Sequence, residues 1–215
     1  MLFVNPDLRL DPEAAERLYA VLSRDVRAGV IGGRLRNPDG SFQPNCREFP
    51  TVFNMIFSRG SVMGRLLGGK RYTLPDYAEP TDVPAVAATM MMVRRDLFVR
   101  MRGFDERFFM YLEDTDLCLR LHRRGFRNCY LPSAGAMHMW ACGSTAGRIR
   151  RTYYHHEAVW KYFLKHLPNV FSLVILPMLL LLHLGLALLF GARRRLPAAV
   201  SSVDMASAGR REGRE

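Results

Sequence analysis

The sequence has very little lysine, no closely spaced cysteines and no internal repeat. Only three of its 31 basic residues are lysines, so arginine supplies nearly all of a net charge of +11. A surplus of this size suggests a polyanionic partner, such as phosphorylated ligands, an anionic membrane surface or a nucleic acid. The four cysteines show no C-x-x-C spacing. They therefore predict reduced thiols in a cytosolic compartment and argue against a zinc site or a disulfide framework.

A length of 215 residues with 49% hydrophobic residues allows one domain with its own core, plus an appendage. The appendage is an uncharged run from Val170 to Gly191. About 20 apolar residues cross a hydrocarbon core of roughly 30 Å as a helix, so this run predicts a membrane helix, with a buried core helix as the alternative. Basic residues flank the run about equally, so the positive-inside rule leaves its orientation open. The Ala/Ser/Arg-rich tail beyond Pro197 predicts disorder.

The rest of the chain alternates between helix and strand patterns, which indicates an α/β fold. A short apolar strand at Leu2–Val4 ends at the turn Asn5-Pro6-Asp7. Apolar spacings of three and four residues predict helices. The predicted helices are Pro12–Ala28 capped by Asp11, Asp96–Met101, and the second half of 103–126 ending at Gly125. The predicted strands are Val30–Leu35, a short strand at 41–43 after the turn Asn37–Gly40, and one buried strand over Val83–Val93.

A group of acids follows an apolar lead-in within residues 103–126. Phe108 to Leu112 come directly before Glu113 and Asp114, and Asp116 follows. Acids near a helix N-terminus stabilise the helix dipole, which is a sufficient structural explanation for them. The apolar lead-in instead places the carboxylates at the rim of the core, where a tuned pKa suits a general base. Asp116 is expected to pair with Arg120 four residues later.

The stretch from Gly103 to Arg120 resembles the acceptor-side segment of family 2 inverting glycosyltransferases, in particular the rhamnosyltransferase-like branch. Further matches follow in the same order along the chain. Leu2–Asp7 resembles the strand end that carries the D-x-D variant of these enzymes, and Gly40–Thr51 resembles their intermediate loop. The other matches are Val93-Arg94-Arg95 before Gly103, His138 with Ser144, and the basic-aromatic segment Arg151–Pro168 before an apolar helix. The resemblance extends from Met1 to about Gly191.

This resemblance implies a GT-A (Rossmann-like) α/β fold and a particular chemistry. A sugar, with rhamnose as the expected one, passes from a nucleotide-diphosphate sugar to a lipid-linked or polysaccharide acceptor with inversion, in the synthesis of a cell-surface polysaccharide. It implies Mg²⁺ or Mn²⁺ bound by Asp7, since hard ions prefer oxygen ligands. His138 is implied as a second metal ligand or a diphosphate contact, with a purely structural histidine as the alternative. Asp114 becomes the expected base, with Glu113 positioning the acceptor. The implied substrate-binding residues are Asn5, Arg94, Asp105 and Ser144.

The resemblance also suggests the domain layout. It predicts the C-terminal portion of a GT-A catalytic domain over 1–150, a connecting helix over 151–168, a membrane helix over 169–192 and a basic disordered tail over 193–215. The expected location is the cytoplasmic face of the cytoplasmic membrane. Relatives begin with β-α units that have no counterpart here, so we expect an N-terminally truncated chain. Two local departures are Ala88-Thr89 in place of Gly-Ala and Arg102 in place of the first of two glycines.

Two other functions compete with this interpretation. A catalytically inactive remnant would keep the basic charge and the apolar segment and act as a membrane-associated binding protein with exposed sheet edges. Binding of a donor sugar nucleotide with Mn²⁺ separates that remnant from the enzyme. Nucleic-acid binding is disfavoured, because the sequence offers no recognition helix or aromatic platform to accompany its charge.

Overall fold

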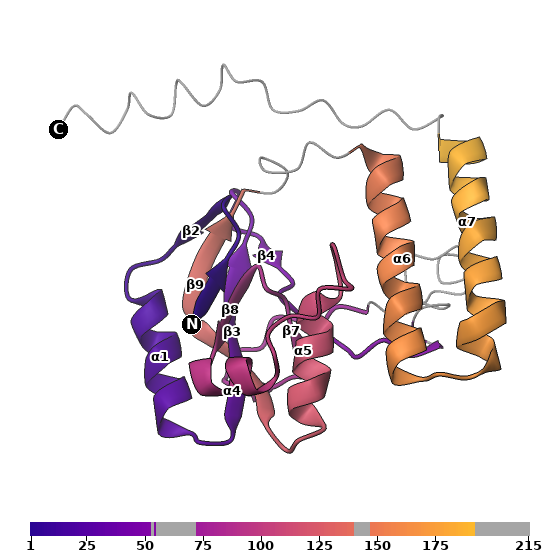
Figure 1. The fold of residues 1–215 in the computed structure, drawn as a ribbon. Coiled ribbons are helices and arrows are strands. Elements are labelled where there is room, and N and C mark those ends of the chain that lie inside the picture. The colour runs from indigo at the N-terminus through magenta and orange to yellow at the C-terminus, as the bar shows by residue number, and fades with distance from the viewer. Residues whose placement is uncertain (53, 55–71, 140–146, 192–215) are drawn as a thin grey trace. The chain divides into compact units, whose positions relative to one another are not determined.

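A computed structural model describes residues 1–52, 54, 72–139 and 147–191 (Figure 1). The chain divides into two compact units, Met1–Pro168 and Asn169–Glu215. The first unit is a mixed α/β domain, which confirms the predicted fold class. Its strands are β1 Leu2–Val4, β2 Leu8–Leu10, β3 Ala28–Arg36, β4 Phe42–Gln43, β5 Cys46–Arg47, β6 Thr81–Asp82, β7 Ala85–Val86, β8 Met90–Val93 and β9 Arg127–His138. Its helices are α1 Ala14–Arg24, α4 Arg95–Arg100, α5 Glu113–His122 and α6 Arg148–His166.

The main sheet has the strand order β1-β8-β3-β9-β2, with β4 added to β3 and β6 added to β9. The long strands β3 and β9 run parallel, and the other pairs in this sheet are antiparallel. A separate two-stranded sheet joins β5 to β7. Among the antiparallel pairs of the described strands, only β3 and β4 are joined by a short turn, and the parallel pair β3 and β9 is joined by a long crossover that includes α4 and α5.

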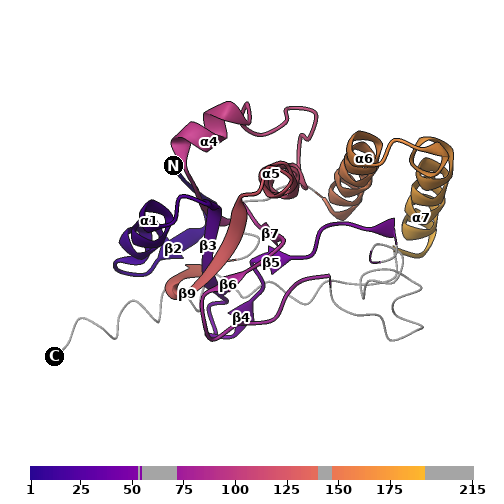
Figure 2. The same ribbon diagram turned by 90° about the horizontal axis from the view of Figure 1, so that it is seen from below.

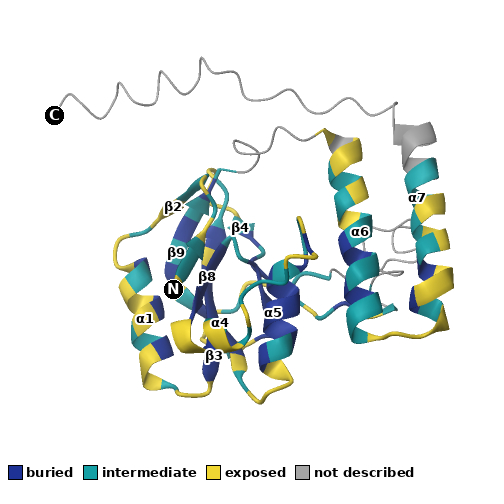
Figure 3. Cartoon of the chain, in the orientation of Figure 1, coloured by how far each residue is buried: buried dark blue, intermediate teal, exposed yellow. Residues whose placement is uncertain are grey.

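Helices cover both faces of the main sheet, as Figure 2 shows from below. On one face Ala14, Leu18 and Leu22 of α1 pack with residues of β3, β8 and β9. On the other face Leu97 of α4 and Leu117 of α5 pack with a second set of strand residues. Burial therefore concentrates in β3, β8 and α5 (Figure 3). This two-layered core gives the sheet the rigidity that a site at its edge requires.

Two local predictions were wrong. Val83–Val93 is two strands in different sheets, because β7 pairs with β5 while β8 pairs with β1 and β3. Asp11 does not cap the first helix, which begins at Ala14 after Glu13 in a left-handed conformation. The Asp11 carboxylate accepts two hydrogen bonds from Arg36 instead. In both cases a partner distant in sequence outweighs the local signal.

A buried ionic cluster holds α6 against α5 in the first unit. Asp116 is fully buried, and its carboxylate accepts hydrogen bonds from Arg120 Nε at 2.7 Å, Lys165 Nζ at 2.5 Å and His166 Nε2 at 2.8 Å. The predicted pair of Asp116 with Arg120 is confirmed. Arg120 also donates to the backbone oxygen of Met101 at 2.6 Å. The cluster thus fixes the helix that begins with Glu113.

The second unit holds a π-helical turn, Phe171–Ile175, followed by helix α7, Leu176–Gly191. The expected helix over 169–192 is therefore divided, and its α-helical part has 16 residues. Within the ranges that the structure describes, no helix has both the length and the apolar character needed to cross a membrane. The structure does not support the membrane helix expected there. The predicted tail at 193–215 lies outside the described residues.

Candidate active site

Asp7 and His138 meet at one end of the main sheet. Asp7 precedes β2 and His138 ends β9, and the pairing of Leu8 with His138 brings them side by side. His138 Nε2 lies 3.1 Å from Asp7 Oδ1, and both side chains are about nine-tenths buried. Asn5 Nδ2 lies 3.5 Å from the same ring nitrogen. The structure thus brings together three of the predicted site residues from opposite ends of the first unit.

This pair fits the ligand set of a hard divalent ion in two respects. It offers one carboxylate oxygen and one imidazole nitrogen, which are ordinary ligands for Mn²⁺. Their separation of 3.1 Å also matches neighbouring ligands of an octahedral ion, which lie about 3 Å apart when each bond is about 2.1 Å. Within the described part of the chain, no group of three or more His, Cys, Asp or Glu side chains gathers. Two side chains alone do not complete the coordination of such an ion.

The acids Glu113 and Asp114 begin α5 after an unusual turn. Tyr111 and Leu112 both have left-handed backbone angles, with φ of 72° and 63°. Such angles are unfavourable for residues with large side chains, and they are typical of sites where the chain must aim particular groups. Leu112 is buried in spite of this conformation. After this turn, Asp114 contacts Arg47 of β5 and Ala88 of the turn between β7 and β8.

The two acids have different surroundings. Asp114 is buried, and its Oδ2 accepts hydrogen bonds from Arg47 Nη2 at 3.1 Å and the Ala88 backbone N–H at 3.0 Å. Its Oδ1 accepts from the backbone N–H and the hydroxyl of Thr115. Glu113 Oε2 is also buried but has no hydrogen-bond partner among the described residues. Burial and the adjacent Asp114 carboxylate raise the pKa of Glu113 to about 7. The pair thus combines one fully bonded carboxylate with one that has a free oxygen.

An extended segment, Phe42–Arg47, connects the two groups of residues. Alternate side chains of an extended chain point to the same face. Gln43 Nε2 lies 2.8 Å from His138 Nδ1, and Arg47 reaches Asp114. Between them the Asn45 amide donates to the backbone oxygens of Gly33 and Met90, both at 3.1 Å. We call Gln43, Asn45 and Arg47 the polar ladder.

The turn between β7 and β8 also joins the two groups. The Asn5 backbone N–H donates to Thr89 O at 3.1 Å, and the Ala88 N–H donates to Asp114. The Ala87 N–H donates to Asn45 O. The two residues that depart from the Gly-Ala of relatives, Ala88 and Thr89, therefore use their backbone groups here. Asp7 with His138 on one side and the acid pair on the other consequently lie next to one short turn.

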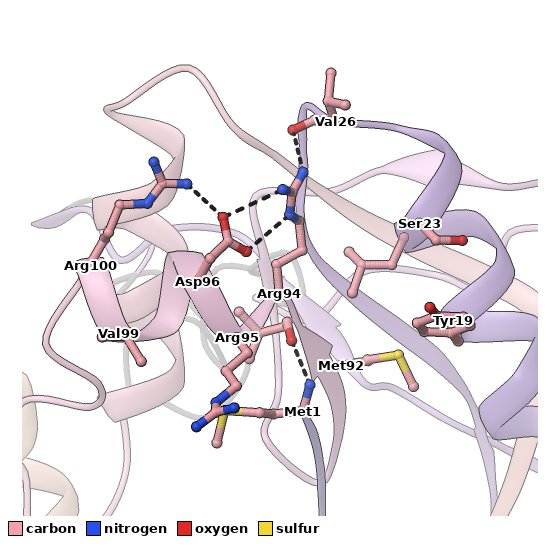
Figure 4. Close-up of a pocket in the computed structure, with 12 residues that line it drawn as sticks. Met1, Tyr19, Ser23, Val26, Met92, Arg94, Arg95, Asp96, Val99 and Arg100 are labelled. Atoms are coloured by element: carbon pink, nitrogen blue, oxygen red, sulfur yellow. Dashed lines mark hydrogen bonds and ion pairs between the residues drawn. The ribbon is translucent and has the colours of Figure 1, made fainter.

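The other predicted substrate-binding residues lie apart. Asp105 belongs to the ionic cluster, where Arg107 and Lys165 hold the pKa of its carboxyl well below its usual range. Arg94 lines a groove beside α1 and α4, in which it binds Asp96 and the backbone oxygen of Val26 (Figure 4). This groove adjoins the Met1 end of β1. Asp7, which contacts His138, comes after the other end of that strand. Ser144 lies outside the described residues.

The ladder residues Gln43 and Arg47 were not predicted as site residues from the sequence. The sequence predicts Gln43 only as the end of a short strand and Arg47 only as part of the segment that resembles the intermediate loop. The available signal was the alternation of polar residues at 43, 45 and 47 across the end of that strand. An alternating pattern predicts a half-buried strand, and polar side chains on its buried face predict specific partners.

No family model matches the chain. An N-acetylglucosaminyl-diphospho-decaprenol L-rhamnosyltransferase of Mycobacterium tuberculosis is 32% identical over 168 residues, covering 74% of this chain and 53% of the relative. A rhamnosyltransferase of Escherichia coli is 39% identical over 94 residues, covering 43% of this chain and 33% of the relative. A hexosyltransferase of low-salt glycan biosynthesis in Haloferax volcanii is 28% identical over 123 residues, covering 57% and 36%. The chain therefore spans about half the length, or less, of these relatives.

A solved structure of GalNAc-T7 with UDP, GalNAc and Mn²⁺ aligns with a TM-score of 0.46 at 13% identity. The alignment covers 74% of this chain and 31% of that chain. Agreement at this level is too weak to assign a ligand or a mechanism.

Proposed function

Because the chain belongs to the rhamnosyltransferase-like glycosyltransferases of family 2, we propose that it takes part in transferring a sugar to a glycan or lipid-linked acceptor. The donor is a nucleotide-diphosphate sugar, with rhamnose as the expected sugar, and the product serves a cell-surface polysaccharide. The observation that supports this most directly is the contact of Asp7 with His138, which lie 131 positions apart in the sequence. In the proposal this contact forms the metal-ligand pair, beside the turn whose Ala88 N–H contacts Asp114.

In this proposal Asp7 and His138 hold Mg²⁺ or Mn²⁺, and Asn5 lies against the same histidine. When bound, the ion neutralises charge on the diphosphate leaving group. Asp7 and His138 would be the two side chains of the described residues that hold the ion. The arginine-rich composition of the chain favours such an anionic donor.

The acid pair supplies the base. The acceptor hydroxyl loses its proton to a carboxylate while its oxygen bonds to the anomeric carbon, and the bond from that carbon to the diphosphate oxygen breaks. A single displacement of this kind inverts the configuration. The resemblance assigns the proton to Asp114, whereas Glu113 has the free oxygen and a pKa of about 7. A base with a pKa near the working pH is the most effective, so both acids belong to the proposal.

We also propose that the chain works at the cytoplasmic face of the cytoplasmic membrane. The second unit exposes large apolar side chains, including Val170, Leu173, Met178 and Leu181. Exposed apolar groups in a protein of high positive charge favour an anionic lipid surface. Flotation with vesicles that contain anionic lipid tests this location, with neutral vesicles as the control. Equal recovery with both kinds of vesicle would count against a charge-assisted location.

The enzymatic proposal is tested with the full chain and a panel of nucleotide-diphosphate sugars in the presence of Mn²⁺. Saturation-transfer NMR reports donor binding, and release of the nucleoside diphosphate reports turnover in the presence of a lipid-linked acceptor. Asp114→Asn and Glu113→Gln are each expected to lower turnover at least a hundredfold while donor binding persists. Asp96→Asn, which removes an exposed acid, is the control. Donor binding without turnover, or neither, would favour the inactive remnant.

A further inference from the structure

The polar ladder reaches both halves of the proposed site from one short segment. Gln43 is buried and lies against His138, while Arg47 lies against Asp114. Their side chains leave the same face of the segment, four residues apart. Asn45 lies between them, is almost fully buried and ties the segment to β3 and β8. The ladder is therefore fixed to the sheet in its middle and contacts one candidate group at each end.

We propose that Gln43 and Arg47 are positioning residues, Gln43 for the metal ligand His138 and Arg47 for the acid Asp114. This inference rests on the proposed function, because it assumes that the first pair binds metal and the second removes a proton. Neither ladder residue needs to touch the substrate. Each acts by holding one ring or one carboxylate in the orientation that its role requires.

Gln43 can decide which ring nitrogen of His138 carries the proton. With the Gln43 N–H donating to Nδ1, the proton lies on Nε2, which then donates to Asp7 and has no lone pair for an ion. Turning the Gln43 amide by half a rotation presents Oε1, which accepts a hydrogen bond from Nδ1–H and frees the Nε2 lone pair. The two orientations have nearly the same shape. As placed, Gln43 Oε1 is buried without a hydrogen-bond partner among the described residues. The turned amide uses that acceptor and suits the metal-bound state.

Arg47 acts on the acid pair through a hydrogen bond and through its positive charge. Arg47 donates to Asp114 Oδ2, the same oxygen that accepts the Ala88 N–H. The hydrogen bond from this guanidinium fixes the plane of the carboxylate. The positive charge of Arg47 also lowers the pKa of Glu113, against the effects of burial and Asp114. Loss of Arg47 therefore leaves two buried carboxylates side by side with less opposing charge.

The first measurement is the dissociation constant of Mn²⁺, obtained from the electron paramagnetic resonance signal of free Mn²⁺ titrated with the full chain. Gln43→Ala is expected to weaken binding 10- to 100-fold, as the loss of a residue that orients a metal-bound histidine commonly does. Gln43→Glu keeps an acceptor for Nδ1–H and should restore binding to within about threefold of wild type. Arg47→Met should leave Mn²⁺ binding unchanged, and so should Glu48→Gln, an exposed neighbour on the same segment.

The second measurement is the pH profile of kcat/KM. Arg47→Met is expected to move the acidic limb of this profile to higher pH, because the positive charge of Arg47 lowers the pKa of Glu113. Arg47→Lys keeps the charge and should return most of that shift. Gln43→Ala, assayed at saturating Mn²⁺, should show the acidic limb at the same pH as the wild type. A merely structural role would instead move both readouts together in both variants.

The possible failures are distinguishable. Wild-type protein that binds neither Mn²⁺ nor donor would overturn the proposed function and this inference with it. Wild-type protein that binds Mn²⁺ while Gln43→Ala binds it equally well would overturn the role of Gln43 alone. An unchanged limb in Arg47→Met would overturn the role of Arg47. Circular dichroism melting of each variant identifies any that fail to fold, and Gln43→Glu and Arg47→Lys then decide each case.

Discussion

Replacing Asp116 with asparagine should destabilise the first unit more than any exposed ion-pair substitution. The carboxylate is fully buried and accepts hydrogen bonds from Arg120, Lys165 and His166 at 2.5–2.8 Å. Asparagine has nearly the same shape but carries no charge and offers one acceptor oxygen in place of two. The basic side chains around it would then stay buried without their central counter-charge.

Removing one partner of a buried ionic group costs about 3–5 kcal/mol. In a unit of this size, 1 kcal/mol lowers the melting temperature by about 2–4 °C, so Asp116→Asn should lower it by roughly 6–20 °C. Far-UV circular dichroism and urea unfolding measure the loss. Asp96→Asn is the matched control, because Asp96 is half exposed in its pairs with Arg94 and Arg100. Exposed pairs contribute at most about 1 kcal/mol.

The same substitution should change the dependence of stability on pH. Burial opposes ionisation of Asp116, but the hydrogen bonds from His166 and Lys165 prevail and keep the pKa of the carboxyl below its usual value. A carboxyl with a lowered pKa stabilises the folded state fully above its unfolded pKa of about 3.9, and this stabilisation is lost as the pH falls through the folded pKa. Wild type and Asp116→Asn should therefore converge in stability below about pH 4. Equal losses for Asp116→Asn and Asp96→Asn at pH 7 would refute the reasoning.

Three further changes test other parts of the structure. Gly33→Ala should lower the free energy of unfolding by about 1–3 kcal/mol, because the new Cβ would lie 2.3 Å from a backbone oxygen. Gly147→Ala is the control, since its Cβ would meet nothing within 4 Å. Equal melting temperatures for the two variants would contradict this prediction. Asn45→Ala should cost about 1–3 kcal/mol in urea unfolding, since two buried carbonyl oxygens lose their donor. With the pKa of Glu113 raised to about 7, the folded state keeps a proton that the unfolded chain loses near pH 4.5, so stability should fall as the pH rises from about 4.5 to 7. Glu113→Gln should flatten this slope, and an unchanged slope would place the proton elsewhere.

Local patterns predicted a good part of the fold. The turn Asn37–Gly40 is present, with Gly40 at φ 81° and its N–H bonded to Asn37 O. Helix α5 occupies the predicted half of its segment and ends at His122, three residues before the predicted terminator Gly125, which has φ of 83°. These features depend on residues within about four positions of one another, so the sequence contains their causes directly.

Features that depend on distant partners were less predictable. An apolar run such as Val83–Val93 has the composition of one strand. Its division into β7 and β8 depends on partners in different sheets, because Val86 pairs with Cys46 and Met92 pairs with Leu2. The same holds at the candidate site. The contact of Gln43 with His138 joins residues 95 positions apart, and that of Arg47 with Asp114 joins residues 67 positions apart. Periodicity carries no information on such pairs. The resemblance to known enzymes suggested Asp7, His138 and Asp114 but not their supports.

The position of Asn45 explains why one segment can serve two sites independently. Its amide donates to carbonyl oxygens of β3 and β8, and its own backbone oxygen accepts the Ala87 N–H. Without this anchor, the five-residue segment Gln43–Arg47 would transmit a displacement at Gln43 directly to Arg47. Because Asn45 is hydrogen-bonded to two strands and a turn, replacing Gln43 or Arg47 should leave the other in place. Groups without shared partners contribute additively to stability. The metal ligand and the acid are therefore held by a common element and can still be altered one at a time.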